Sequence, residues 1–236
     1  TLFLHIAQHA TDQSICVITG DIVHSKLDMS PELINMLTKF FNGFHIPTIV
    51  ILGNHDMNLN NLYRLDAISP ILDVINNSNI HFIKENGLFK FANIVFNHMA
   101  VDVAPKNYIQ AKDFDAHYKI ALHHGAVHNA KTDIGFQISN DHVTTDLFEG
   151  HDLTLLGDIH KPAQFLNKEK TIGYPGSLIQ QNHGEALDHG ILVWDLPDRS
   201  AEFIEIENDY GYVTFEVDNA KIINSPHRVP NKPRVR

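Results

Sequence analysis

The stretch "IPTIVILGNHDM", residues 46–57, decides how this chain folds. An unbroken apolar run rich in β-branched residues ends at Gly53, and Asn54, His55 and Asp56 follow at once. A continuous apolar run of this length is typical of a strand buried on both faces, as in a parallel sheet. We therefore expect a central strand whose carboxyl end carries polar side chains.

The segment before this run predicts a helix. In "SPELINMLTKFFNGF", residues 30–44, Ser30 can act as the N-cap and Pro31 takes the first helical position. Apolar residues recur on one face of that helix: Leu33, Ile34, Leu37, Phe40 and Phe41. A shorter strand, 15–19, precedes the helix, so strand, helix and strand predict a right-handed parallel crossover.

The same ending, an apolar run followed by metal-ligand types, occurs at four places along the chain. These are Gly20-Asp21 with His24, Gly53-Asn54-His55-Asp56, His123-His124-Gly125, and Gly157-Asp158-Ile159-His160. Glycine permits a tight turn after a strand, and the tips of adjacent strands can bring distant residues together. One such motif is weak evidence, but four in order predict a site for divalent cations such as Mn²⁺, Zn²⁺ or Fe²⁺.

Composition limits the class of protein. The 236 residues suffice for one large α/β domain or two small ones, and no run of 18 apolar residues predicts a membrane span. A single cysteine, Cys16, excludes a disulfide framework and favours a reducing compartment. We expect a soluble intracellular protein, cytoplasmic or in the nucleoid or nucleus. The formal charge of −10 does not exclude nucleic acid, because bound cations and local basic patches can override it.

The remaining segments predict a mixed architecture. Residues 1–10 have the pattern of an amphipathic helix, residues 60–76 that of a helix interrupted by Pro70, and residues 79–99 that of strands around a Glu-Asn-Gly turn. From residue 163 onward, short alternating runs predict antiparallel strands of a second sheet. We expect a catalytic domain over 1–218, and over 219–236 a basic, proline-rich linker toward a cap or partner-binding region.

The motifs "VITGDIVHSK", "VILGNHD", "ALHHG", "LLGDIHKP" and "YPGSLIQQNHGE" resemble those of the calcineurin-like metallophosphoesterases. The last two resemble the Mre11/SbcD branch of DNA nucleases in particular. The resemblance implies a two-sheet αββα sandwich, two divalent metal ions, most simply Mn²⁺, and cleavage of DNA in recombination and repair. It also implies an SbcC/Rad50-type ATPase partner, and the sequence leaves open whether the chain forms a homodimer.

Position by position, the resemblance implies roles for individual residues. Asp21 would bridge both metals, Asn54, His123 and Asp158 would complete one of them, and His160 would ligate the other. His55, paired with Asp56, would be the catalytic or phosphate-contacting histidine, and His24 a second phosphate contact. Further DNA contacts are expected from Lys161, Tyr174 and Ser177, and from Arg228, Lys232, Arg234 and Arg236, although a solvated linker explains the last four equally well.

Two departures from the family pattern stand out. The family begins with a strand ending in Asp-x-His, but no such strand precedes Asp21, so we expect that the first part of the natural protein is absent. The Asp-Ala-His at 115–117 has the same spacing but precedes its strand, so we interpret it as a coincidence. The nuclease branch carries Gly-His-x-His where this chain has Asp158 in place of the first histidine. A carboxylate can replace imidazole on a hard cation, which predicts an altered metal preference, whereas the alternative is that Asp158 only caps a turn.

Several alternatives stay open at this point. His124, next to the predicted ligand His123, could face the opposite side of its strand or lie behind the metal ligands, and His98 ends a strand without a clear role. The chain could also be a general phosphoesterase acting on small phosphoesters or phosphoproteins, or a non-catalytic scaffold that keeps the fold.

Overall fold

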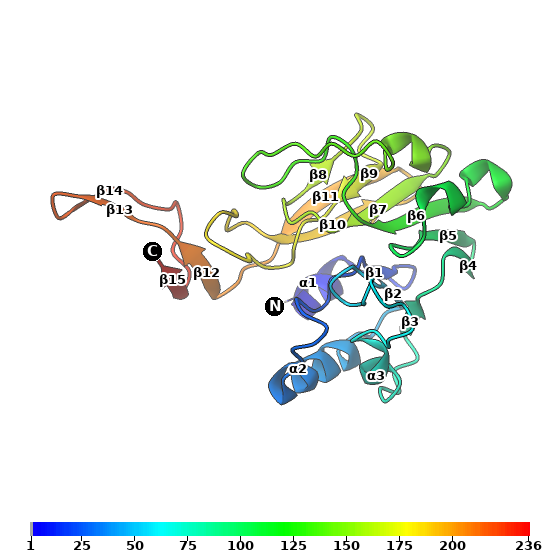
Figure 1. Cartoon of the computed structure of the whole chain (residues 1–236), viewed down its shortest axis with the longest axis horizontal. Coiled ribbons are helices and arrows are strands. Elements are labelled where there is room, and N and C mark those ends of the chain that lie inside the picture. Colours follow the sequence, from blue (N-terminus) through cyan, green and yellow to red (C-terminus); the bar gives the residue numbers. More distant parts are fainter. Residues whose placement is uncertain (1) are drawn as a thin grey trace.

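Two β-sheets face each other in the computed structural model, which describes residues 2–236 (Figure 1). The first sheet has three parallel strands in the order β1-β2-β3: Cys16–Ile18, Thr48–Ile51 and Ile80–Ile83. The second has six strands in the order β4-β5-β6-β7-β9-β8: Gly87–Phe91, Ile94–Met99, Tyr118–His124, Leu153–Gly157, Ile172–Tyr174 and Gln164–Phe165. Strands β5, β6, β7 and β9 run parallel, so their carboxyl ends share one edge.

Strand β2 is buried on both faces, as its continuous apolar run predicts. Ile49 and Ile51 pack against the second sheet, where they meet Leu122 of β6. Val50 points the other way, toward the helices that cover the first sheet. Because successive strand residues point to opposite faces, a strand between two layers needs apolar residues at every position.

The helical layer on the first sheet starts where the sequence predicts. Helix α2 (Pro31–Asn42) begins after Ser30, whose Oγ accepts the N–H of Leu33 at 3.2 Å. Its residues Leu37 and Phe41 are buried, whereas Ile34 is 42% exposed, so the buried face is narrower than expected. Helix α1 (Leu2–His9) lies beside α2, with Phe3 packed on Phe40 and Phe44, as the amphipathic pattern of 1–10 indicates.

The outer face of the second sheet is covered by loops and 3₁₀ turns instead of α-helices. The turns are η1 (Pro105–Asn107), η2 (Ala111–Asp113) and η3 (Thr145–Phe148). Tyr108 and Phe148 from this layer pack with Met99 and Leu156 of the sheet. The two-sheet α/β fold is therefore confirmed, but its second outer layer is not built of long helices. No helix within residues 2–236 has the length and apolar character to cross a membrane.

Two local predictions are wrong in whole or in part, and a third is confirmed. The helix expected over 60–76 is only α3 (Ser69–Leu72), in which Pro70 lies in the first turn, where proline is tolerated, and does not interrupt a longer helix. The strands predicted around the Glu85–Gly87 turn are confirmed as β3, β4 and β5, with β3 in the first sheet and β4 in the second, so this segment passes from one sheet to the other. Beyond residue 163, β8 and β9 pair antiparallel but belong to the six-stranded sheet, where β9 also runs parallel to β7, whereas β10 (Gly190–Asp195) and β11 (Ser200–Glu205) form an antiparallel pair in a separate sheet.

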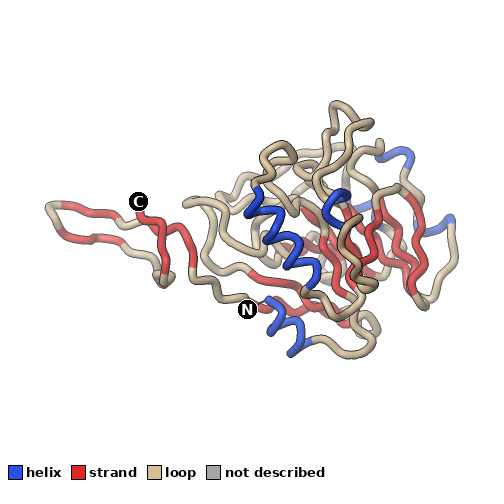
Figure 2. The backbone as a smooth tube through the Cα atoms, turned by 90° about the horizontal axis from the view of Figure 1, so that it is seen from below, coloured by secondary structure: helices blue, strands red, loops and turns tan. Residues whose placement is uncertain are grey.

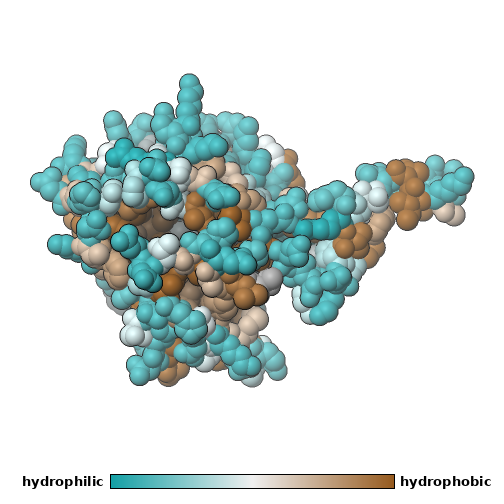
Figure 3. Space-filling model, turned by 180° about the vertical axis from the view of Figure 1, so that it is seen from behind, coloured by the Kyte–Doolittle hydropathy of each residue, from teal (hydrophilic) through white to brown (hydrophobic). Residues whose placement is uncertain are grey.

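The C-terminal segment forms an arm that projects from the body (Figures 1 and 2). Strand β12 (Tyr210–Val213) pairs in parallel with β15 (Lys232–Val235), and β13 (Glu216–Asp218) pairs antiparallel with β14 (Lys221–Asn224). Strands β14 and β15 fall within 219–236, so the predicted linker contains paired strands, and its role as a linker stays a prediction. Figure 3 shows apolar surface on the arm, where Ile222 and Ile223 are each 64% exposed.

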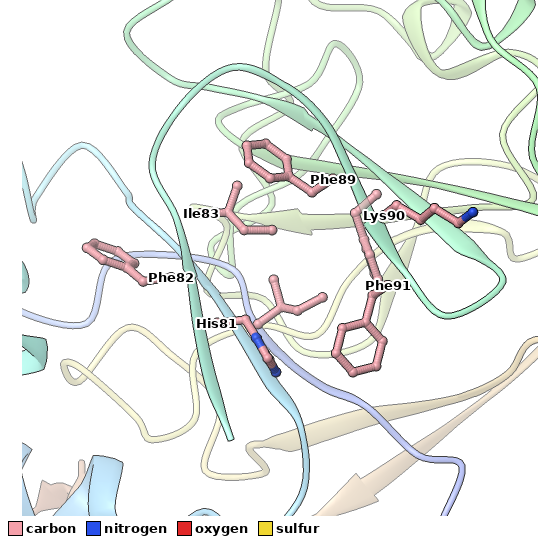
Figure 4. A pocket seen from close by; sticks show the side chains of 8 residues that line it. His81, Phe82, Ile83, Phe89, Lys90 and Phe91 are labelled. Atoms are coloured by element: carbon pink, nitrogen blue, oxygen red, sulfur yellow. The ribbon is translucent and has the colours of Figure 1, made fainter. Parts of the chain in front are cut away.

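A hollow of about 250 Å³ lies at the edge of the sandwich between β3 and β4 (Figure 4). His81 and Phe91 meet there edge to face, with ring centroids 5.1 Å apart. Its other lining residues are apolar apart from Lys90, and none of the polar strand-tip residues contributes to it. This hollow is therefore separate from the candidate site.

Candidate metal centre

The polar strand ends converge as the sequence predicts. Within residues 2–236, one group of at least three metal-ligating side chains comes together, formed by Asp21 after β1, His124 at the end of β6 and Asp158 after β7. One ligand atom from each of the three lies within 4.8 Å of the others. Asn54, after β2, joins them with its Oδ1 2.9 Å from Nε2 of His124. Four strands thus supply this centre.

Three glycines allow the strand ends to approach so closely. A Cβ on Gly20 would lie 2.6 Å from the backbone N of Gly53, and a Cβ on Gly53 would overlap the carboxylate of Asp21. A Cβ on Gly157 would overlap the carbonyl oxygen of Thr19 and lie 2.7 Å from Nδ1 of His124. Each glycine is therefore required by the space around His124, in addition to the backbone freedom that a tight turn needs.

The hydrogen bonds of His124 leave its second nitrogen facing oxygen atoms. Nδ1 donates to the carbonyl of Thr19 at 2.7 Å, which fixes the proton on that nitrogen. Nε2 then faces Asp21 Oδ1 at 3.3 Å and Asp158 Oδ1 at 3.9 Å. A lone pair that faces carboxylate oxygens is stable only if a positive charge lies among them, either a proton on Nε2 or a cation. The donor set therefore fits a divalent metal ion held by one imidazole, two carboxylates and the Asn54 amide oxygen.

The ionisation of these groups reflects the same crowding. Burial alone would lower the pKa of His124, but the hydrogen bond to Asp21 and the negative charges of Asp21 and Asp158 outweigh it, so the pKa is raised. Burial also opposes ionisation of Asp21, yet His124 and the backbone N–H of His55 bring its pKa below the usual value. Asp158 has a raised pKa because of burial and, after partial compensation by His124, repulsion from Asp21. A cation would relieve that repulsion.

Asp21 and Asp158 both have unusual backbone conformations. Asp21 has a φ of 52° and Asp158 a φ of 95°, in the region that favours glycine. Non-glycine residues hold such conformations at a cost of about 1–3 kcal/mol, which surrounding structure has to offset, and they gather at functional sites. The strain supports the prediction that Asp158 is a ligand and does more than end a turn.

The histidine in this centre is His124 and not His123. Leu122 of β6 faces the core between the sheets, so the alternation of strand residues places His124 on that side and His123 on the other. His123 is 3% exposed, donates from Nδ1 to the carbonyl of Met99 at 2.9 Å and packs on Tyr108 and Phe148. This placement does not support the predicted ligation by His123. The apolar alternation in "IALHH" was the available sequence indication for His124.

His24 and His55 lie beside the cluster. Their rings stack with centroids 5.3 Å apart and an interplanar angle of 20°, and Nδ1 of His55 donates to the carbonyl of His24 at 2.7 Å. The backbone N–H of His55 also donates to Asp21 Oδ1 at 3.0 Å. These contacts tie the loop after β2, which carries His55, to Asp21 and to the loop after β1, which carries His24.

The predicted pairing of His55 with Asp56 is wrong. Asp56 is fully buried and accepts backbone N–H groups from Gly53 at 2.8 Å and Val23 at 3.0 Å. Burial raises its pKa to about 6, against the opposing effect of these two hydrogen bonds. Asp56 braces the loops after β1 and β2, because both of its oxygens are used by backbone donors.

His160 lies outside the compact cluster. Its side chain is 45% exposed, and Nδ1 is 2.9 Å from Oε1 of Glu185. Sequence reasoning missed Glu185, which lies 25 positions away along the chain and belongs to no strand tip. Ligation by His160 stays a prediction.

The predicted DNA-contacting residues divide into different environments. Tyr174 is fully buried, and its hydroxyl donates to Gly125 O at 2.7 Å and accepts from Val127 N at 2.9 Å, so its predicted phosphate contact is wrong. Ser177 is half-buried, with Oγ donating to Ile179 O at 2.8 Å. Lys161 is half-buried beside His160.

The basic residues near the C-terminus have partners within the chain. Arg228 pairs with Glu205 at 2.7 Å, and Arg234 donates to the Tyr212 hydroxyl at 2.7 Å. Lys232 lies over the ring of Tyr210, 4.8 Å from its centroid. These contacts weaken the prediction that the tail offers free phosphate contacts; Arg236 is exposed.

Two other sequence candidates are structural. His98 is 2% exposed, donates from Nδ1 to Glu85 O at 2.8 Å and has a pKa lowered by burial. Asp115 and His117 precede β6, at the opposite end of that strand from His124, which agrees with treating their Asp-x-His spacing as coincidence.

Comparison with known proteins agrees with the site. The family model described as calcineurin-like phosphoesterase matches residues 1–172, which include every strand tip of the centre. The chain is 44% identical over 238 residues to "Uncharacterized protein R555" of Acanthamoeba polyphaga mimivirus, covering 96% of this chain but only 17% of that protein. It is 27% identical over 200 residues to "Putative phosphoesterase 244L" of Invertebrate iridescent virus 6, covering 81% of this chain and 68% of that protein. The chain belongs to the calcineurin-like phosphoesterase family.

Proposed function

We propose that this chain is a divalent-metal-dependent phosphodiesterase that cleaves DNA. The convergence of Asp21, Asn54, His124 and Asp158 at four strand tips carries the proposal, because it gathers metal ligands beside two stacked histidines. Three oxygen donors and one imidazole suit Mn²⁺ better than a cation that prefers nitrogen or sulfur. Divalent cations bound there would supply charge that polarises a phosphoryl group and lowers the pKa of water.

The protein's own groups hold the reacting parts in place. Asp21 and Asp158 keep their carboxylates at the centre through strained backbone, and Asp56 fixes the loops on either side of Asp21. This bracing matters because catalytic geometry has to be held to within about 0.5 Å. Asp56 thus supports the reaction geometry from a buried position, without itself contacting substrate.

His55 is the group proposed to act on the phosphoester. Because Nδ1 donates to a carbonyl, the neutral ring has its unprotonated nitrogen at Nε2. In the protonated state, Nε2 can donate to a phosphate oxygen or to the leaving oxygen. His24, stacked on His55 and exposed, is proposed as the second phosphate contact.

The proposal that DNA is the substrate rests on the segment that begins at the end of β9. The motif "YPGSLIQQNHGE", 174–185, resembles the nuclease branch, and its loop lies against His160, with Ser177 N donating to His160 O at 3.1 Å. The same proposal includes the ATPase partner that the resemblance implies, and a homodimer.

The test compares substrates under Mn²⁺, Mg²⁺ and chelator. Linear duplex DNA, single-stranded DNA, bis(p-nitrophenyl) phosphate and p-nitrophenyl phosphate are incubated with the wild type, His55→Ala and Asp21→Asn. His45→Ala is the matched control, because His45 is exposed and precedes β2, at the opposite end of that strand from Asn54 and His55. DNA cleavage that depends on metal, survives in His45→Ala and is lost in both site variants is the expected result. Absence of DNA cleavage by the wild type with every cation refutes the proposal.

A second candidate function is hydrolysis of small phosphoesters. The formal charge of −10 and the internal partners of Arg228 and Arg234 leave little free basic surface for a long nucleic acid. Cleavage of an aryl phosphoester without cleavage of DNA, in the same assay, would establish this alternative.

A further inference from the structure

We infer that Glu185 is a positioning residue that sets the ring orientation and tautomer of His160 for metal binding. The inference rests on the proposed function, since His160 is its predicted second-metal ligand. The motif "YPGSLIQQNHGE", 174–185, ends at Glu185, but the resemblance assigned no role to this residue.

The contact itself fixes the tautomer. A carboxylate can only accept, so the 2.9 Å contact places the proton of His160 on Nδ1 and leaves the lone pair on Nε2. Metal-bound histidines commonly donate their other nitrogen to a carboxylate in this way, which orients the ring and raises its basicity.

The two partners differ in exposure. His160 is 45% exposed, whereas the side chain of Glu185 is 6% exposed. A half-exposed imidazole on a strand tip would otherwise be free to rotate between rotamers. The buried carboxylate is therefore the fixed partner, and the ring adapts to it.

Glu185 is itself held by its own loop. Its Oε2 accepts Gln181 N at 2.6 Å, and its Oε1 also accepts Asn182 Nδ2 at 2.8 Å. Gln180 donates to the Glu185 carbonyl at 2.9 Å. Both carboxylate oxygens are satisfied before any metal binds, so the group is preorganised for His160.

The same loop also contacts the backbone of His160. Ser177 N donates to His160 O at 3.1 Å, and a Cβ on Gly176, which has a φ of +89°, would lie 2.7 Å from that oxygen. Residues 176–185 thus contact both the main chain and the ring of His160. An ordinary surface ion pair would not have this second attachment.

The test measures Mn²⁺ binding and the tautomer of the His160 ring separately. Mn²⁺ binding to the whole chain is measured by calorimetry and electron paramagnetic resonance for the wild type, Glu185→Gln, Glu185→Asp and Asp21→Asn. Glu202→Gln is the matched control, because Glu202 is an exposed strand residue on β11. Long-range ¹H–¹⁵N spectra of the metal-free protein report the tautomer of His160, with its signals assigned by His160→Gln.

We expect Glu185→Gln to weaken Mn²⁺ binding by about 10–100-fold, Glu185→Asp to weaken it less, and Glu202→Gln to leave it unchanged. The wild-type spectrum is expected to show the proton of His160 on Nδ1, and Glu185→Gln a mixture of tautomers. A proton on Nε2 in the wild type, or equal Mn²⁺ affinity in Glu185→Gln, would overturn the inference.

Failure of the proposed function gives a different result. If neither the wild type nor Asp21→Asn binds Mn²⁺, the metal proposal fails, and the spectra of the metal-free protein still decide whether Glu185 sets the ring. If Glu185→Gln does not fold, Glu185→Asp supplies the comparison.

Discussion

Replacing Gly157 with alanine tests whether close packing of the strand tips builds the metal centre. The new Cβ would overlap the Thr19 carbonyl oxygen and lie 2.7 Å from Nδ1 of His124. The Thr19 oxygen belongs to the backbone, so it cannot rotate away as a side chain would. Either β7 or the end of β1 has to move.

The cost has two parts. Overpacking of a tight site costs about 1–3 kcal/mol. Separating Thr19 O from His124 Nδ1 leaves a buried donor and acceptor without their 2.7 Å hydrogen bond, which costs about 1–3 kcal/mol more. We expect Gly157→Ala to lower the free energy of unfolding by about 2–6 kcal/mol and to weaken Mn²⁺ binding, because the ring of His124 loses its anchor.

Urea denaturation in chelator measures the stability, and calorimetry measures Mn²⁺ binding. Gly135→Ala is the control, because Gly135 has a φ of +83° but nothing within 4 Å of an added Cβ. The free energy of unfolding of Gly135→Ala should fall by about 1–2 kcal/mol from backbone strain alone, and this variant should bind Mn²⁺ normally. The reasoning is refuted if Gly157→Ala is no less stable than Gly135→Ala and binds Mn²⁺ like the wild type.

Three further predictions concern Tyr174, His123 and Asp158. Tyr174→Phe should lose about 2–4 kcal/mol of stability in urea denaturation, because Gly125 O and Val127 N lose their partner, while Mn²⁺ affinity stays unchanged; a normal stability would contradict this structural role. Burial lowers the pKa of His123 from 6.5 to about 4. The contribution of the neutral ring to folding stability is therefore fully present above pH 6.5 and is lost as the pH falls toward 4. Unfolding free energies in chelator should therefore lose about 3 kcal/mol over that range, and a His123→Gln variant with the same pH slope would count against the assignment. Asp158→His, which restores the family pattern, should shift selectivity toward Zn²⁺ in Mn²⁺/Zn²⁺ competition by calorimetry, and unchanged selectivity would argue that Asp158 is no ligand.

The sequence by itself determined the central strands and their polar ends. The run 46–57 requires a strand with two buried faces, and the glycines at 20, 53 and 157 mark where those strands stop. These features are local, because burial of every side chain and a turn after a glycine depend on a few consecutive residues. The cap at Ser30 is local for the same reason, and it is confirmed.

Only the tertiary structure decided which polar residues meet. His123 and His124 are adjacent in the sequence, and the pleat of β6 sends one to the outer layer and the other to the centre. The family resemblance pairs Asp56 with His55, yet the hydrogen-bond partners of Asp56 are Gly53 and Val23 on two loops. Glu185 reaches His160 through a loop that no periodic pattern marks. Such pairings depend on the register of strands and on contacts between distant segments, and for that reason residue order alone does not determine them.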